Sequence, residues 1–254
     1  MKTMLLYEKL TPVNRDQHKA LRVKPSEKNL SFARDLNSML LATTELPLAA
    51  LDFPCVFVQS GDEHTLVSIV GLRDKENLFL DDAGRWEPGT YVPAFIRRYP
   101  FVLAEAAGDT TFTVCLDRAC PGLGTEQGQA LFDAEGRETP WLEEIKRFLL
   151  SFRQEMQVSR EFANHLAALE LLQDGVIEYT LDGEKSTLRG FKTINEAKLR
   201  ALGAATLKDL ADKGWLGWAY AHLLSIQQVQ RLALRLDERR RQDSAERDAA
   251  PAMH

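Results

Sequence analysis

Residues 55–71 read CVFVQSGDEHTLVSIVG, and this stretch decides the fold class. Two apolar runs, residues 55–58 and residues 66–70, are rich in β-branched side chains. Gly61 lies in the polar segment between them, and Gly71 follows the second run. Short apolar runs separated by turn residues are typical of antiparallel strands. The stretch therefore predicts two neighbouring strands of an antiparallel meander.

Further strand signals extend this meander through the first half of the chain. Residues 78–80, 101–104 and 112–116 are short apolar or alternating runs bounded by turn residues or proline. One helix is expected among them, because Phe32, Leu36, Met39 and Leu40 recur at helical spacing. The sequence L80-D-D-A-G-R85 resembles F132-D-A-E-G-R137, and both are expected to form turns.

The second half of the chain is mainly helical. Thr139 is a favourable N-cap and Pro140 fits the first helical position. Apolar residues recur every three or four positions from there to Leu172, which predicts one long helix or two helices broken near Ser159. Gly175 is the expected C-terminal glycine of this helical run.

A hairpin around Asp182-Gly183, a short helix over residues 195–201 and a long final helix complete the predicted pattern. The expected fold class is α+β. A strongly curved antiparallel sheet from the N-terminal half packs against helices from the C-terminal half. Residues 1–242 are expected to form a single domain, and residues 243–254 a disordered tail.

Composition limits the possible classes of protein. The chain has 254 residues and a formal net charge of −5, so it lacks the general basic character of a nucleic-acid-binding protein. Its three cysteines cannot all form disulfides with one another, and reduced thiols are expected. The apolar run at residues 4–7 is too short for a signal peptide, and no stretch approaches a membrane span. We expect a cytoplasmic protein without a nucleic-acid partner.

Two segments contain candidate ligand-binding residues, each with a structural alternative. The guanidinium group of Arg97 beside Tyr99 suits an anionic ligand, although one arginine of the Arg97-Arg98 pair could form an ion pair while the other stays solvated. His222 shares a helix face with tryptophans and could transfer protons in a pocket, or could be a buried histidine that donates to a carbonyl. The aromatic residues could line a pocket or form the core. The candidates are Arg97, Tyr99, Trp141, Trp218, Tyr220 and His222.

Other motifs favour structural explanations. Gly122-Leu123-Gly124 is a fragment of a dinucleotide-binding pattern without its strand–turn–helix context, which favours a loop. The five histidines lack metal-binding spacing, so neither a metal nor a cofactor is expected. The final helix carries concentrated positive charge, which its acidic neighbours partly offset, and this favours a solvent-facing surface with ion pairs over a nucleic-acid contact. Its arginines are Arg231, Arg235, Arg239, Arg240 and Arg241.

Several short segments resemble the SapC family of bacterial proteins. They are Tyr99-Pro100-Phe101, Leu131-Phe132-Asp133 with Gly136, Thr139-Pro140, Leu188 with Gly190-Phe191, and residues 220–225, YAHLLS. The resemblance covers most of the chain. It implies an association with the surface layer in name, and genes that often lie beside halogenase-like and TonB-dependent receptor genes. It provides no catalytic residues.

Three functions are compatible with these observations. The first is a non-catalytic binding or accessory protein, linked to an envelope or uptake system, that binds a protein partner or a small molecule. The second is a small-molecule enzyme with a site assembled from scattered residues, for which Arg97, Tyr99, Tyr220 and His222 are the first candidates. The third is a surface-layer component. Because no catalytic signature is found, the first is favoured; a homodimer and a monomer fit the sequence equally well.

Overall fold

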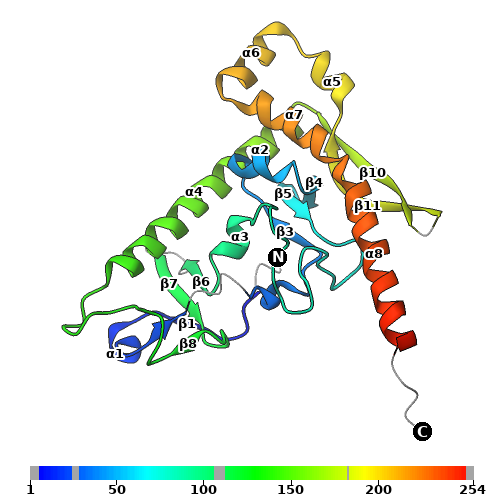
Figure 1. The fold of residues 1–254 in the computed structure, drawn as a ribbon. Coiled ribbons are helices and arrows are strands. Elements are labelled where there is room, and N and C mark those ends of the chain that lie inside the picture. Colours follow the sequence, from blue (N-terminus) through cyan, green and yellow to red (C-terminus); the bar gives the residue numbers. More distant parts are fainter. Residues whose placement is uncertain (1–5, 25–28, 106–111, 182, 250–254) are drawn as a thin grey trace. The chain divides into compact units, whose positions relative to one another are not determined.

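Figure 1 shows the computed structural model of the chain, which describes residues 6–24, 29–105, 112–181 and 183–249. Helices and antiparallel strands are both abundant, so the predicted α+β class is confirmed. The chain divides into two compact units, each assembled from three separate segments. Unit 1 holds Met1–Ala33, Leu80–Pro88 and Val92–Gln157, and unit 2 holds Arg34–Phe79, Gly89–Tyr91 and Val158–His254. The expected single domain over residues 1–242 stays a prediction.

Unit 1 contains two small antiparallel sheets. Strands β1 (Leu10–Pro12), β7 (Phe112–Asp117) and β6 (Phe101–Glu105) form one sheet in the order β1-β7-β6. Strands β8 (Leu123–Gly124), β2 (Arg22–Val23) and β9 (Gln129–Ala130) form the other in the order β8-β2-β9. The predicted strands at residues 101–104 and 112–116 are therefore confirmed, and they pair with each other.

The helical elements of unit 1 are short except for α4. They are α1 (Arg15–His18), the 3₁₀ helix η1 (Ser31–Ala33), α3 (Ala94–Arg97) and the part of α4 (Pro140–Ala168) up to Gln157. Leu142 and Leu149, on the first turns of α4, lie in one buried apolar cluster with strand residues such as Val23, Phe101 and Leu116. Burial of this cluster stabilises unit 1.

The two similar sequences in unit 1 form the same turn, as predicted. Asp81 accepts hydrogen bonds from the backbone and side chain of Arg85 at 2.8 and 2.7 Å, and Asp133 accepts the equivalent pair from Arg137 at 2.8 Å each. Gly84 and Gly136 adopt φ angles of 74° and 81°, which side chains disfavour. A shared turn chemistry therefore explains the sequence similarity.

Unit 2 is built on a five-stranded antiparallel sheet. Its strands are β3 (Ser38–Leu40), β4 (Cys55–Ser60), β5 (Glu63–Ile69), β10 (Leu172–Leu181) and β11 (Glu184–Ile194), in the order β10-β11-β4-β5-β3. The predicted pair at residues 55–58 and 66–70 is confirmed as β4 and β5. The β10–β11 hairpin from the second half joins this sheet, so its strands do not come from the N-terminal half alone. The curvature of the sheet stays a prediction.

Helices surround this sheet within unit 2. They are η2 (Thr43–Glu45), α2 (Leu46–Ala49), α5 (Glu196–Arg200), α6 (Ala204–Asp212), α7 (Trp215–Ser225), α8 (Gln228–Ala249) and the end of α4 from Val158. Helix α7 packs on β11, β4 and α2, and α8 packs on β10. Within the described ranges no helix is both long enough and apolar enough to span a membrane.

The long helix α4 begins where the sequence predicts. Thr139 Oγ1 accepts a hydrogen bond from the Leu142 N–H at 3.3 Å, and Pro140 is the first helical residue. The helix continues through Ser159, so one helix is formed rather than two. The prediction that Gly175 ends this helical run is wrong, because Gly175 lies in β10 instead. The boundary expected at residue 243 falls within α8, and residues 250–254 lie outside the described residues.

The prediction of a helix around residues 32–40 is also wrong. Residues Ser31–Ala33 form η1, and Ser38–Leu40 form β3, which pairs with β5. Met39 lies opposite Ser68 in this pairing and is buried. The apolar spacing of this segment is compatible with a helix and with a strand. The pairing with β5 decides in favour of the strand.

Glycine at position 175 is required by close packing inside the hairpin. Gly175 lies opposite Phe191, and a Cβ atom at residue 175 would be 2.2 Å from Phe191 Cε2. We expect Gly175→Ala to lower the free energy of unfolding by roughly 1–3 kcal/mol, because the phenylalanine ring must move. The midpoint of urea unfolding measures the change.

Gly217→Ala is the matched control. Gly217 lies in α7, and nothing is within 4 Å of a Cβ built there. This change should raise the free energy of unfolding by about 0.5–1 kcal/mol, since alanine is favoured over glycine inside a helix. Equal effects of the two substitutions would show that the Gly175–Phe191 contact is not the constraint.

Candidate functional site

A hollow of about 390 Å³ in unit 2 gathers positive charge at one place. Its walls come from the residue after η1, from the loop after β5 and from α8. Among the described residues, every one that lines it is charged or carries a side-chain amide. We name it the basic hollow, and its lining residues are Arg34, Arg73, Asp74, Lys75, Glu76, Asn77 and Arg239.

The loop after β5 is folded around the buried carboxylate of Glu76. Glu76 Oε2 accepts hydrogen bonds from the backbone N–H groups of Leu72 and Arg73, each at 3.2 Å. Its Oε1 accepts from Arg73 Nε at 2.8 Å and also from Arg73 Nη2. A Cβ on Gly71 would be 2.0 Å from the Glu76 carbonyl oxygen, so this approach requires glycine. The carboxylate therefore fixes both the loop and the Arg73 side chain.

Three arginines recur every fourth residue on one face of α8 and contact the segment between residues 51 and 79. Arg231 Nη1 donates to the Leu51 carbonyl at 3.3 Å, and Arg239 Nη1 donates to the Asn77 carbonyl at 3.1 Å. Arg235 lies between them, with its guanidinium carbon 4.4 Å from the Phe79 ring centroid. The contact with Asn77 brings the guanidinium group of Arg239 to the loop of the basic hollow.

The basic hollow carries an excess of positive charge. Four cationic side chains and two carboxylates line it, which leaves a formal charge of +2. Glu76 is held by Arg73, and Asp74 Oδ1 accepts a hydrogen bond from Asn37 Nδ2 at 3.4 Å. Arg73, Asp74 and Lys75 are exposed, so solutes have access to the hollow. The arrangement is suited to bind an anion.

Sequence reasoning missed most of this site. Among its seven residues, only Arg239 belongs to a group that the sequence singles out, and there the expectation is a solvent-facing helix with ion pairs. The stretch Arg73-Asp74-Lys75-Glu76 reads as an ordinary polar loop. Its partner Arg239 lies 162 residues from Asn77 in the chain, so no local pattern joins them.

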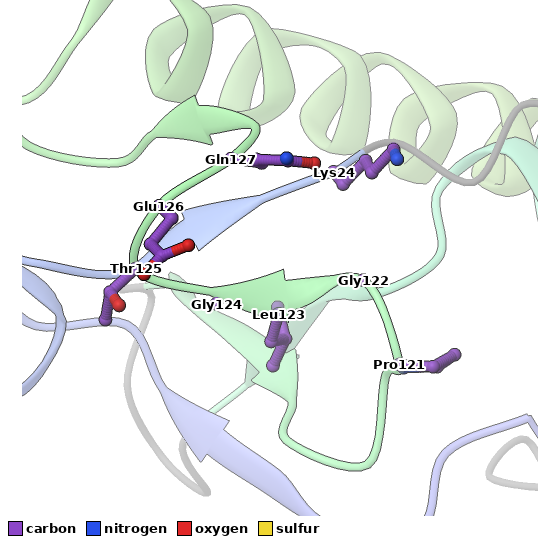
Figure 2. Close-up of a pocket in the computed structure, with 8 residues that line it drawn as sticks. All are labelled: Lys24, Pro121, Gly122, Leu123, Gly124, Thr125, Glu126 and Gln127. Carbon is purple, nitrogen blue, oxygen red and sulfur yellow. The ribbon is translucent and has the colours of Figure 1, made fainter.

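A second hollow, of about 340 Å³, lies in unit 1 beside the β8-β2-β9 sheet (Figure 2). It contains the Gly122-Leu123-Gly124 segment, where Lys24 N donates to the Gly122 carbonyl at 2.8 Å. A Cβ on Gly122 would be 2.5 Å from the Lys24 carbonyl oxygen. Close approach of the chain explains this glycine, and Leu123–Gly124 form strand β8 rather than the expected loop. One lysine and one glutamate line the hollow, so its charge is balanced; the lining residues are Lys24, Pro121, Gly122, Leu123, Gly124, Thr125, Glu126 and Gln127.

Three of the predicted ligand-binding residues lie in unit 1. Arg97 is exposed at the end of α3, where its Nε donates to the Val92 carbonyl at 3.0 Å. Tyr99 is half-buried and stacks on Phe32 at a centroid distance of 3.8 Å. Burial raises the pKa of Tyr99, and the nearby Cys120 and Asp117 raise it further. Trp141 packs edge-on against Phe101 at 5.7 Å. Their ligand-binding role stays a prediction.

Arg98 differs from its neighbour Arg97 in being buried. Its guanidinium carbon lies 4.5 Å from the ring centroid of Phe95, 5.1 Å from that of Phe152 and 5.8 Å from that of Tyr7. Its Nε and Nη2 have no hydrogen-bond partner in the part of the chain that the structure describes. The two arginines therefore point to different environments, as expected, but aromatic rings rather than a carboxylate surround the buried one.

The other three predicted residues lie in unit 2, on α7. Trp218 packs edge-on against Phe162 at a centroid distance of 5.6 Å, and Tyr220 is 40% exposed. His222 is completely buried, and its ring lies 5.0 Å from that of Phe57. Three of the six candidates therefore belong to unit 1 and three to unit 2. The ligand-binding role of this second set also stays a prediction.

His222 is hydrogen-bonded to the sheet in a way that the sequence does not reveal. Its Nε2 accepts the backbone N–H of Ile194 at 3.1 Å, so the neutral ring carries its proton on Nδ1. The ring is buried, as the structural alternative expects, and it accepts a backbone N–H in addition. Burial lowers the pKa of His222 to about 4, and the Cys55 carbonyl only partly opposes this shift.

Metal-binding residues do not gather at either hollow. Within the described ranges, no group of three or more His, Cys, Asp or Glu side chains is placed to hold a metal ion. The basic hollow lacks histidine and cysteine among its described lining residues, and its composition suits an anion better than a cation. The expectation about metals and cofactors stays a prediction.

Replacing the central carboxylate of the loop should loosen the basic hollow. In Glu76→Gln, the side-chain NH₂ group must face either the Arg73 guanidinium or the two backbone N–H groups, donor against donor. We expect the free energy of unfolding to fall by about 1–3 kcal/mol, and the Leu72 and Arg73 amides to exchange faster. Hydrogen exchange followed by mass spectrometry measures both. Glu63→Gln, at an exposed position of β5, is the control, and equal exchange in the two variants would contradict this role.

Buried His222 should make the fold less stable in acid. Its folded-state pKa of about 4 lies below the ordinary value of 6.5, so between these pH values the unfolded chain binds a proton that the folded chain does not. This contribution to stability is complete above pH 6.5 and is lost as the pH falls. From pH 7 to pH 5, His222 should remove about 2 kcal/mol from the free energy of unfolding.

The substitution His222→Gln tests this assignment, because glutamine keeps an acceptor for the Ile194 N–H but does not titrate. Urea unfolding at pH 7 and pH 5 should show a pH dependence smaller by about 2 kcal/mol than in the wild type. His18 and His64, whose pKa values burial also lowers, keep their contributions in both proteins. An unchanged difference between the two pH values would contradict the assignment.

Comparison with known proteins yields one family. The SapC family model matches residues 13–232, which is most of the chain. The match includes Arg34 and the loop of the basic hollow, and it ends within α8 before Arg239. No curated protein and no solved structure matches the chain. The resemblance seen in the short sequence segments is thereby confirmed, and the chain belongs to the SapC family.

Proposed function

We propose that this SapC-family protein is a non-catalytic binding protein that takes an anionic ligand in the basic hollow. The observation that carries the proposal is the composition of the hollow, where three guanidinium groups and one ammonium group face two carboxylates. An excess of hydrogen-bond donors with fixed positive charge is the usual composition of an anion site.

The geometry of the hollow supports binding rather than turnover. Its two carboxylates already have structural partners, since Glu76 holds Arg73 and the loop N–H groups, and Asp74 accepts from Asn37. Arg239 is positioned by the Asn77 carbonyl before any ligand arrives. A site whose donors are already placed loses less entropy when it binds. The alternative enzyme, with Arg97 and Tyr99 in unit 1 and Tyr220 and His222 in unit 2, has no comparable observation in its favour.

We place this binding protein in the cytoplasm, as an accessory component of an envelope or uptake system. The SapC family, which is associated with the surface layer in name, supports the connection with the envelope. Its partner would be the anion itself or a protein that receives it. A surface-layer component would instead be recovered with the envelope when host cells are fractionated.

Isothermal titration calorimetry of the full chain with pyrophosphate and with citrate tests anion binding. We expect saturable binding of at least one of them at one site. Lys75→Asn should weaken it about tenfold or more, since a charge-assisted hydrogen bond contributes roughly 1.5–3 kcal/mol. Asparagine tolerates the left-handed backbone of Lys75, whose φ is 55°. Pyrophosphate recovered unchanged by ³¹P NMR would agree with a non-catalytic role.

Lys185→Gln is the matched control, because it also removes one positive charge but lies on the exposed β11 strand away from the hollow's lining residues. It should bind like the wild type. Absence of saturable binding for both anions, or equal weakening in the two variants, would overturn the proposal.

A further inference from the structure

The lining of the basic hollow restricts the chemistry of its ligand. Ligands with a ring or an alkyl chain are bound mainly by apolar and aromatic side chains. Of the described residues, those that line this hollow are arginine, lysine, aspartate, glutamate and asparagine. A nucleobase or another apolar body would find no apolar surface there. The bound group is therefore compact and polar throughout.

The excess charge of the hollow indicates a doubly charged group. Its formal charge of +2 remains after both lining carboxylates are counted. A single carboxylate carries one negative charge, and one arginine fork satisfies its two oxygens. A phosphate monoester carries roughly −1.5 to −2 at pH 7 and presents three strong acceptor oxygens. The charge of a phosphate group therefore matches the hollow more closely than that of a carboxylate.

The origin of the cations leads to the same conclusion. Arg34 follows η1, Arg73 and Lys75 belong to the loop after β5, and Arg239 lies on α8. Side chains from three separate segments of the chain therefore line the hollow, and they are not confined to one helix face or one strand. A tetrahedral anion accepts hydrogen bonds from several directions, whereas a carboxylate accepts them close to its own plane.

Fixed side chains make this charge distribution specific. Arg73 uses Nε and Nη2 to bind Glu76, and Arg239 uses Nη1 to bind the Asn77 carbonyl. Guanidinium groups held in this way keep their orientation, so selectivity between anions of different shape follows from the protein and not from ligand charge alone.

We propose that the anion bound in the basic hollow is a phosphate group, carried either by a compact free phosphate or by the headgroup of a lipid. This proposal rests on the anion-binding function above and specifies its ligand. The two sources share one chemistry, because in both a phosphate group enters an exposed, wholly polar hollow.

Competition between anions in solution tests the chemistry. At fixed ionic strength, the full chain is titrated with inorganic phosphate and malonate, and then with pyrophosphate and citrate. We expect each phosphate to bind at least tenfold more tightly than its carboxylate counterpart. Lys75→Asn and Arg34→Gln should each reduce phosphate affinity tenfold or more, whereas Lys185→Gln leaves it unchanged. Circular dichroism confirms that the variants are folded.

Sedimentation with vesicles distinguishes the two sources. Vesicles of phosphatidylcholine with phosphatidic acid present exposed phosphate monoesters, and vesicles of phosphatidylcholine alone are the control. Sedimentation with the first kind only, reversed by pyrophosphate and lost in Lys75→Asn, would support a lipid headgroup. Tight pyrophosphate binding without sedimentation would support a free phosphate.

Two results would overturn the phosphate assignment, and only one of them would also overturn the anion-binding function. Citrate and malonate binding as tightly as the phosphates, with the same dependence on Lys75, would reject phosphate but keep an anion-binding protein. Failure of all four anions and both kinds of vesicle to bind would reject the anion-binding function as well.

Discussion

The contact between α8 and the segment from residue 51 to residue 79 determines whether the basic hollow exists. This contact is polar and aromatic along one face of the helix, where Arg231, Arg235 and Arg239 meet a carbonyl, a ring and a second carbonyl. Its alternating chemistry fixes the position of the helix along the segment. A shift by one residue would move all three guanidinium groups away from their partners. Arg239 thus reaches the hollow because it belongs to the same row of arginines, four residues apart, that holds α8 against this segment.

The loop on the other side of the hollow is ordered by a different means. Glu76 is a buried carboxylate surrounded by donors from its own loop, and Gly71 permits the close approach that this requires. A buried charge without such partners would be unfavourable by several kcal/mol, so the loop has little freedom to rearrange. Loop and helix together present charge at fixed positions in front of solvent. This combination supports recognition of a ligand more directly than it supports chemistry on one.

Local sequence signals predicted the elements of the fold better than their pairing. Thr139 and Pro140 mark the start of α4, and the runs around Val56 and Val67 mark β4 and β5, because caps and β-branched runs act over a few residues. The apolar residues around Met39 fit a helix as well as a strand, and the pairing with β5 makes this segment a strand. Gly175 has the local context of a helix end, but the Phe191 ring across the hairpin is what requires a glycine there. Such contacts have no signature in the local sequence.

The same distinction explains the site. The chemistry of the aromatic residues and of His222 suggests a site, yet Trp218 packs against Phe162, and His222 packs against Phe57 and binds the Ile194 backbone. The residues of the basic hollow are unremarkable one by one, and they matter only because the fold brings the 71–77 loop to α8. Sequence reasoning would have needed the long-range contact between Asn77 and Arg239 in order to find them.

The interleaving of the two units has a consequence for synthesis on the ribosome. All three segments of unit 1 have emerged once residue 157 leaves the exit tunnel. Strands β4 and β5, by contrast, emerge about 100 residues before the β10–β11 hairpin that extends their sheet, and α8 emerges last. The edge of β4 that pairs with β11 therefore stays unpaired while most of unit 1 is synthesised. An unpaired strand edge is open to pairing with other chains, so this interval is when the nascent chain is most exposed to aggregation, and the unit completed first is not the one that contains the basic hollow.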